Sequence, residues 1–137
     1  MEHRIGFYET DAMGVVHHSN YLRFFERARV VWLEEHDRPY AYYMDLGLHF
    51  AVTRCEVDYT LGARFDDLLV VTTWAEWVHG ASLRMAYTVE RGDQRFASGA
   101  TEHASVDSEG RVRRIPREDR GRLQALVAPN SSPQKLG

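Results

Sequence analysis

Hydrophobic side chains recur in this chain with two different periods, one helical and one extended. Over residues 21–35 they return every three to four positions, which predicts an amphipathic helix. Ser19 or Asn20 is suited to cap its start. The apolar face consists of Tyr21, Phe24, Phe25, Ala28, Val31 and Trp32. Arg29 and Glu35 interrupt that face, so we expect either a buried ion pair or a second surface that covers part of the helix.

After Gly47 apolar and polar residues alternate, which predicts β-strands with one covered face. The first alternating series is Thr53, Cys55, Val57 and Tyr59, and a later one is Leu83, Met85, Tyr87 and Val89. Residues 68–78 are more uniformly apolar, as in a central strand. Residues 95–107 predict another long strand, whose small side chains would let a helix pack closely: Ala97, Gly99 and Thr101.

Shorter patterns complete the expected fold. Residues 2–8 predict a first strand, Pro39 to Met44 a short helix ended by Gly47, and 111–115 an edge strand. A helix is expected from Pro116 to about Val127. Turn sequences at 91–93 and 107–110 have hairpin spacing, so the sheet should be largely antiparallel. These patterns predict an α+β domain over residues 1–127, a long helix against a curved sheet, with residues 128–137 as a flexible tail.

Composition narrows the function classes. The chain has 137 residues, 44% hydrophobic and 27% charged, with a net charge of −3. This balance gives no general attraction to nucleic acid or to an anionic membrane. A single cysteine excludes an intramolecular disulfide, and no apolar run approaches the roughly 20 residues that span a bilayer. With no signal-peptide pattern, we expect a cytoplasmic protein without membrane insertion.

The loop before the long helix carries the strongest candidate for chemistry. Asp11 is followed by Gly14 and by the polar run His17-His18-Ser19-Asn20. Asp11 alone is equally typical of a turn or a helix cap. Polar residues ahead of an apolar helix face favour a cleft, and the unpaired N–H groups at a helix start stabilise negative charge. The loop is therefore a candidate site for stabilising an oxyanion.

Other motifs give weaker or structural interpretations. His17 and His18 lack a third ligand at a suitable spacing, so we expect no metal and no cofactor. No Gly-x-Ser-x-Gly or phosphate-binding glycine motif occurs. Cys55 is expected to be a buried structural thiol, and Glu26 a solvated helix residue paired with Arg23 or Arg29. Four aromatic residues are expected in the core or an interface: Tyr59, Trp74, Trp77 and Tyr87.

The run from Arg4 to Leu33 resembles the 4-hydroxybenzoyl-CoA thioesterase family of hotdog-fold acyl-CoA thioesterases, especially its Tol-Pal-associated branch. The resemblance lies in Glu-Thr-Asp-Ala-Met-Gly-Val-Val, in His-x-Asn-Tyr-Leu and in Phe-Glu-x-Ala-Arg. Weaker similarity continues at Val57-Asp58-Tyr59, Arg64-Phe65-Asp66-Asp67 and Arg114-Ile115-Pro116. The resemblance implies a hotdog fold.

The resemblance also implies roles for individual residues. The family's essential aspartate corresponds to Asp11, and its oxyanion donor to the backbone N–H of His18, whose side chain would help to bind or polarise the substrate. The family often has a tyrosine four residues before the aspartate, where this chain has Phe7. CoA in such proteins lies along strands near a subunit interface, which implies contacts with His79, Ser82 and Arg84.

The function implied is hydrolysis of a small or medium acyl-CoA, with Asp11 as nucleophile or general base. A hotdog hydratase would place a paired Asp and His differently. A noncatalytic acyl-CoA-binding protein and an acyl-carrier-protein thioesterase are the alternatives, the latter through a basic cluster that could attract an acidic carrier. That cluster consists of Arg111, Arg113, Arg114 and Arg117. We expect a homodimer or homotetramer, because a single sheet needs cover on its face and edge.

Overall fold

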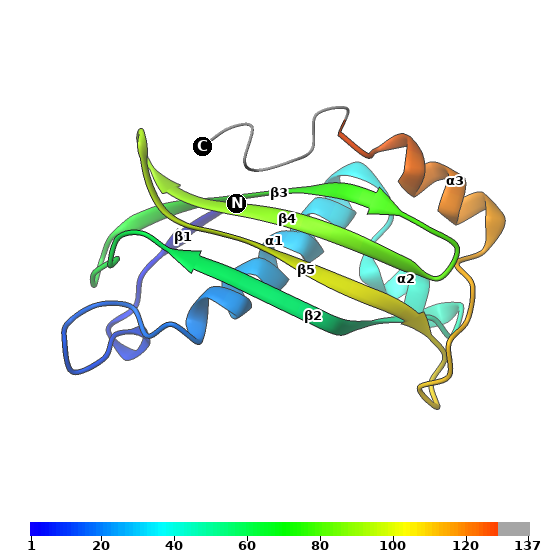
Figure 1. The fold of residues 1–137 in the computed structure, drawn as a ribbon, viewed down its shortest axis with the longest axis horizontal. Helices are drawn as coiled ribbons and strands as arrows, with labels where there is room; N and C mark the ends of the chain where they lie inside the picture. The colour runs from blue at the N-terminus through cyan, green and yellow to red at the C-terminus, as the bar shows by residue number, and fades with distance from the viewer. Residues whose placement is uncertain (129–137) are drawn as a thin grey trace.

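A five-stranded antiparallel sheet and one long helix make up most of the computed structural model, which describes residues 1–128 (Figure 1). The order of the strands across the sheet is β1-β3-β4-β5-β2. The strands are β1 (Glu2–Arg4), β2 (His49–Tyr59), β3 (Leu68–Val78), β4 (Ser82–Arg91) and β5 (Gln94–Val106). The helices are the 3-10 turn η1 (Phe7–Glu9), α1 (Asn20–His36), α2 (Tyr40–Asp45) and α3 (Arg117–Ala125). The predicted α+β architecture is confirmed.

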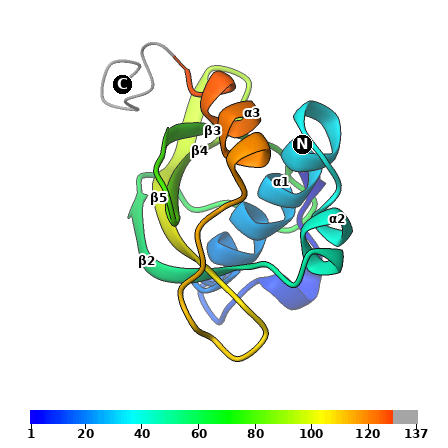
Figure 2. The same cartoon turned by 90° about the vertical axis from the view of Figure 1, so that its right-hand side faces the viewer.

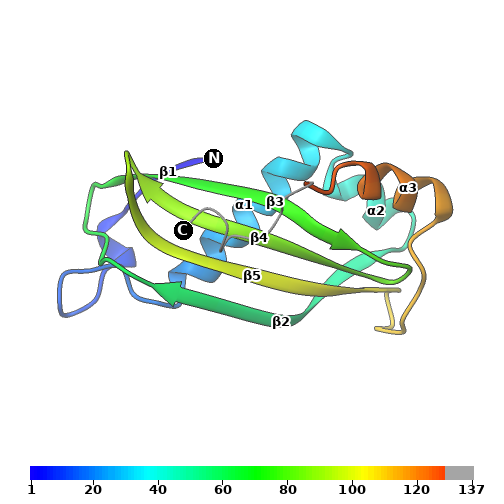
Figure 3. The same cartoon turned by 45° about the horizontal axis from the view of Figure 1, so that its top comes forward.

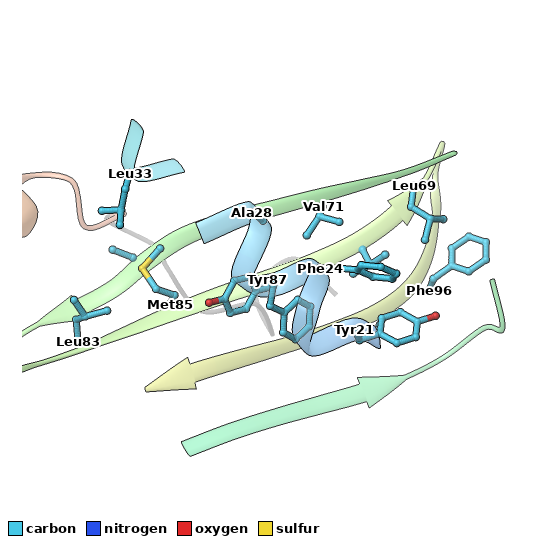
Figure 4. Close-up of a cluster of buried hydrophobic side chains, with 14 of the residues drawn as sticks. Tyr21, Phe24, Ala28, Leu33, Leu69, Val71, Leu83, Met85, Tyr87 and Phe96 are labelled. Atoms are coloured by element: carbon cyan, nitrogen blue, oxygen red, sulfur yellow. The ribbon is translucent and has the colours of Figure 1, made fainter. Parts of the chain in front are cut away.

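The apolar face of α1 forms the centre of the core. The sheet curves around this helix, and α2 and α3 lie beside its C-terminal half (Figure 2). The ring of Phe25 stacks on Tyr87 of β4 with centroids 4.2 Å apart. Tyr87 belongs to a cluster of buried side chains that includes Phe24 and Ala28 of α1 (Figure 4). A Cβ atom at Gly99 would lie 2.8 Å from the Phe25 ring and 2.4 Å from the Glu56 carbonyl. The expected need for small residues on β5 is thus confirmed at Gly99.

Several element boundaries differ from the prediction. The first strand ends at Arg4, because the chain turns into η1. β3 lies next to an edge strand and β4 is central, although β3 is paired on both sides. Residues 111–115 form no strand: their pairing is limited to one bridge between Val106 and Val112. Ser19 precedes α1 without a side-chain cap, since its hydroxyl pairs with His17 Nδ1 at 2.8 Å.

The exposed edge of the sheet explains a wrong prediction. Strand β2 is paired only with β5, and most of its residues are exposed (Figure 3). Cys55 lies on this strand and is exposed rather than buried. The alternating pattern predicts a covered face, but within residues 1–128 no strand pairs with the outer edge of β2.

Arg29 does not form the buried ion pair that its place on the helix suggested. Its Nη1 donates a hydrogen bond to the Tyr87 hydroxyl at 3.1 Å. Neither Arg29 nor Glu35 forms an ion pair with another described residue. The guanidinium of Arg29 on the apolar face of α1 is therefore hydrogen-bonded to a neutral hydroxyl group of the sheet.

The predicted tail, residues 128–137, lies outside the described residues except for Ala128. The proposed division into a domain of residues 1–127 and this tail stays a prediction. Within the described part of the chain, no helix is long and apolar enough to cross a membrane.

Candidate active site

The loop that carries Asp11 is a compact turn. An antiparallel bridge between Thr10 and Val16 closes it, and the Asp11 N–H donates to the Val15 carbonyl at 2.8 Å. Gly14 has φ +79°, a conformation that costs other residues free energy. The Gly14 N–H donates to the Asp11 carbonyl at 2.9 Å. The sequence Asp-Ala-Met-Gly-Val thus holds one backbone geometry just before α1.

The Asp11 carboxylate has one occupied and one free oxygen. Its Oδ1 accepts hydrogen bonds from the N–H groups of Met13 at 2.8 Å and Val15 at 3.4 Å. No described residue donates to Oδ2. The structural and functional interpretations of this aspartate are therefore compatible, because one oxygen orients the side chain while the other is available to a substrate or a water molecule.

The start of α1 supplies a backbone donor. The N–H of His18 has no hydrogen-bond partner in the described part of the chain, and the His18 carbonyl accepts from the Tyr59 hydroxyl at 3.1 Å. Partial burial and nearby Cys55 raise the pKa of Tyr59, so its hydroxyl is protonated at neutral pH and can donate. Asn20 Nδ2 donates to the Glu9 carbonyl at 2.9 Å. The first turn of the helix is thus fixed from two directions.

Asp11 and His18 line one open depression of about 290 Å³. Tyr21 and Tyr59 form its aromatic wall, with ring centroids 5.2 Å apart. The His18 ring stacks on His17 at 4.2 Å. A carboxylate residue and a histidine whose backbone N–H lacks a described partner therefore line one depression. Such groups can activate a nucleophile and stabilise an oxyanion.

The other three predicted residues lie at the opposite end of the sheet. His79 lies in the turn between β3 and β4, and Ser82 is the first residue of β4; this turn is far from the Asp11 loop (Figure 1). The His79 N–H donates to the Ser82 carbonyl at 2.8 Å, and the His79 ring stacks on Trp77 at 4.3 Å. Within one copy of the chain these residues do not reach Asp11, and their contacts with CoA stay a prediction.

Arg84 is held by three carboxylates on the outer face of the sheet. It pairs with Glu76 at 2.9 Å, Glu102 at 2.6 Å and Glu56 at 2.5 Å. Hydrogen bonds to these acids raise the pKa of Arg84, against the opposing effect of burial. A CoA phosphate would have to compete with all three carboxylates for this guanidinium.

Neither the metal candidates nor Glu26 forms the contacts considered from sequence. Among residues 1–128 there is no group of three or more His, Cys, Asp or Glu placed to hold a metal ion. Glu26 forms no ion pair with Arg23, Arg29 or any other described residue, contrary to its expected pairing. It lies instead on the wall of a second groove.

Tyr59 is the site residue that sequence reasoning missed. It was expected in the core or an interface, yet it is 50% exposed and contacts the start of α1. Its position at the last residue of β2 was the available signal. A strand end next to a helix start brings polar side chains to backbone groups that lack partners.

Comparisons with known proteins agree with this geometry. The thioesterase-like superfamily model matches residues 5–131. The chain is 34% identical over 105 residues to the acyl-CoA thioesterase YbgC of Haemophilus influenzae, covering 76% of this chain and 77% of that protein. A Thermus thermophilus structure superposes with a TM-score of 0.87 at 33% identity, covering 92% and 97% of the two chains. DHNA-CoA thioesterase from Staphylococcus aureus superposes with a TM-score of 0.84 at 26% identity, covering 92% and 90%.

Proposed function

Because the chain belongs to the thioesterase-like superfamily, we propose that it hydrolyses the thioester of a small or medium acyl-CoA at Asp11. The observation that carries this proposal is that one depression is lined both by Asp11, whose Oδ2 accepts from no described residue, and by His18, whose N–H has no described partner. Carboxylate and backbone donor have complementary roles in acyl transfer, one toward the nucleophile and one toward the developing oxyanion.

Two routes are compatible with this arrangement. In the first, Asp11 Oδ2 takes a proton from water while the water oxygen attacks the thioester carbonyl. The tetrahedral intermediate then expels the CoA thiolate, which takes up the proton that Asp11 received from water, and Asp11 is again a carboxylate. In the second, Oδ2 attacks directly, CoA leaves, and water hydrolyses the mixed anhydride. In both routes the His18 N–H donates to the oxyanion, and the leaving thiol, with a pKa of about 8.5, needs no strong acid.

We propose that the working enzyme is a homodimer or a homotetramer. Strand β2 offers 11 residues of an open sheet edge, and its Val52 is 54% exposed. An unpaired edge of this length with apolar side chains is typical of a surface that pairs with another strand. A second copy would also bring its own β3–β4 turn toward the site. The proposed location stays the cytoplasm.

An acyl-carrier-protein thioesterase is the second candidate. Within the described part of the chain, Arg114 and Arg117 are exposed and have no carboxylate partner, whereas Arg111 pairs with Glu109 at 3.1 Å. Arg113 donates to the Leu46 carbonyl at 2.8 Å. Arg114 and Arg117, three residues apart, are thus available to bind an acidic carrier protein, since complementary charge accelerates association.

The first experiment measures thiol release from short-chain, long-chain and aromatic acyl-CoAs and from the same acyl groups on carrier protein. Asp11→Asn keeps the hydrogen bonds of the turn through its amide oxygen but removes the charge, so we expect turnover to fall by at least a hundredfold. Asp45→Asn, on exposed α2, is the matched control and should keep wild-type turnover. Full activity in Asp11→Asn would overturn the proposed mechanism, and a wild type inactive on every thioester would overturn the function.

A further inference from the structure

A second groove lies along α1, about one helical turn beyond His18, which lines the Asp11 depression. It has a volume of about 240 Å³, and its walls are Leu22, Arg23, Glu26 and Arg29 of α1 with Val52, Cys55 and Thr101 of the sheet. His18, Leu22, Glu26 and Arg29 follow one another at spacings of four, four and three residues, so they form one stripe of the helix. Along this stripe the groove lies between Leu22, one turn after His18, and Arg29, about 16 Å along the helix from His18.

Arg29 stands where this groove ends. Beyond it lies a narrow cavity of about 20 Å³, roughly the space of one water molecule, enclosed largely by apolar side chains. Its walls include Trp32, Leu33, Phe50, Met85 and Leu123. Arg29 lines both spaces. Its side chain therefore stands between the groove beside the proposed reaction site and an apolar pocket in the core.

A chain of buried hydrogen bonds holds Arg29 in this place. The Tyr87 hydroxyl accepts from Arg29 Nη1 at 3.1 Å and lies 2.6 Å from Thr101 Oγ1, which lies 2.8 Å from His103 Nε2. Tyr87 and His103 are fully buried and Thr101 is 3% exposed, so the anchor is rigid. An apolar chain that moved past Arg29 would have to displace this contact and bury an uncompensated cation.

We propose that Arg29 is the specificity-determining residue that limits acyl-chain length, by closing the groove between α1 and β2 in front of the apolar core cavity. The inference rests on the proposed function, since it assigns this groove to the acyl group of the substrate. Because the groove is closed at Arg29, it suits the acyl group. The CoA part of the substrate carries charged phosphates and requires a path that is open to solvent. The apolar Leu22, Val52 and Cys55 provide the first contacts for the acyl chain.

The test compares binding of a series of S-alkyl-CoA thioethers, which cannot be hydrolysed, to the wild type and to two variants by calorimetry. In the wild type we expect affinity to rise with chain length and then to stop rising. In Arg29→Ala, which joins groove and cavity, the rise should continue, with at least a tenfold gain for the longest chains. Arg29→Met keeps the packing of the stem without the charge and should show the same direction if Arg29→Ala folds poorly.

Arg27→Ala provides the matched control, because Arg27 is exposed on α1 and lines neither space. It should reproduce the wild-type dependence on chain length. An unchanged dependence in both Arg29 variants would overturn the inference, as would a wild type that binds no thioether. A wild type that binds thioethers but releases no thiol from acyl-CoA would overturn the proposed function and leave the length limit standing.

Discussion

Asp11 has a structural role beside the chemical one that we propose for it. Its Oδ1 closes the turn through the Met13 N–H, and no described residue donates to Oδ2. From the sequence, Asp11 is an equally good turn residue or catalytic carboxylate, as though the two interpretations compete. They do not, because a carboxylate has two oxygens and a turn needs only one of them. The local pattern makes the loop a candidate site, and the family resemblance adds the expectation that Asp11 is the essential carboxylate.

Tyr59→Phe tests whether the position of the His18 backbone matters for the reaction. The variant removes the hydrogen bond to the His18 carbonyl, so kcat/KM should fall up to about tenfold, the equivalent of one ordinary hydrogen bond. The melting temperature should change little, because the ring is half exposed. Tyr8→Phe, at a side chain that is 82% exposed, is the control. Equal activity of Tyr59→Phe and the wild type would exclude a positioning role.

His103 should make the stability of the fold depend on pH. Burial, and then the charge of Arg29, lower its pKa to about 4 from an unfolded value near 6.5. The unfolded chain binds the proton more readily, so the contribution is fully present above pH 6.5 and is lost as the pH falls through 4. The loss is on the order of 3 kcal/mol. Urea unfolding at several pH values measures this. Between pH 6.5 and 5 the free energy of unfolding should fall less in His103→Leu than in the wild type.

Among the secondary-structure elements, the two periods of the hydrophobic pattern predicted α1 and the long strands correctly. The burial of these strands was predicted less well. Alternation along β2 predicts one covered face with Cys55 on it, whereas Cys55 is exposed. Alternation along a strand indicates which of its faces is apolar. It does not indicate whether that face is covered by the same chain or by another molecule. The partner of Arg29 could not be predicted either, because Tyr87 is 58 residues away in sequence.

The contact between α1 and β5 should be sensitive to a single methyl group. Gly99→Ala places a Cβ against the Phe25 ring and the Glu56 carbonyl, so we expect the free energy of unfolding to fall by about 1–3 kcal/mol. Gly121→Ala, in the open on α3, should raise it by up to about 1 kcal/mol through helix propensity. Chemical denaturation measures both, and a neutral Gly99→Ala would mean that α1 can shift on the sheet.

For the whole molecule, the sheet edge predicts assembly. We expect light scattering to give at least twice the chain mass of 15.8 kDa. Val52→Glu puts a charge on the β2 edge and should shift the protein toward monomer, whereas Val112→Glu, at an exposed side chain off this strand, should not. A monomeric wild type would contradict the proposal.

The arrangement of the whole site was the least predictable level. Sequence reasoning grouped Asp11 with His18, and both line one depression, because they are close along the chain. It also brought His79, Ser82 and Arg84 toward the same substrate, yet the sheet places them at its other end, and Arg84 is surrounded by acids from three different strands. Such groupings depend on the order of the strands in the sheet, which is not encoded in a local pattern.

The exposed thiol of Cys55 makes this groove accessible to chemical labelling without any mutation. Cys55 is the only cysteine of the chain and forms part of the groove wall, opposite the stripe of α1 that leads from His18 to Arg29. A maleimide fluorophore would therefore attach at a single, known position. Its emission would report when an acyl chain enters, and the rate of its attachment would follow how often the groove is open.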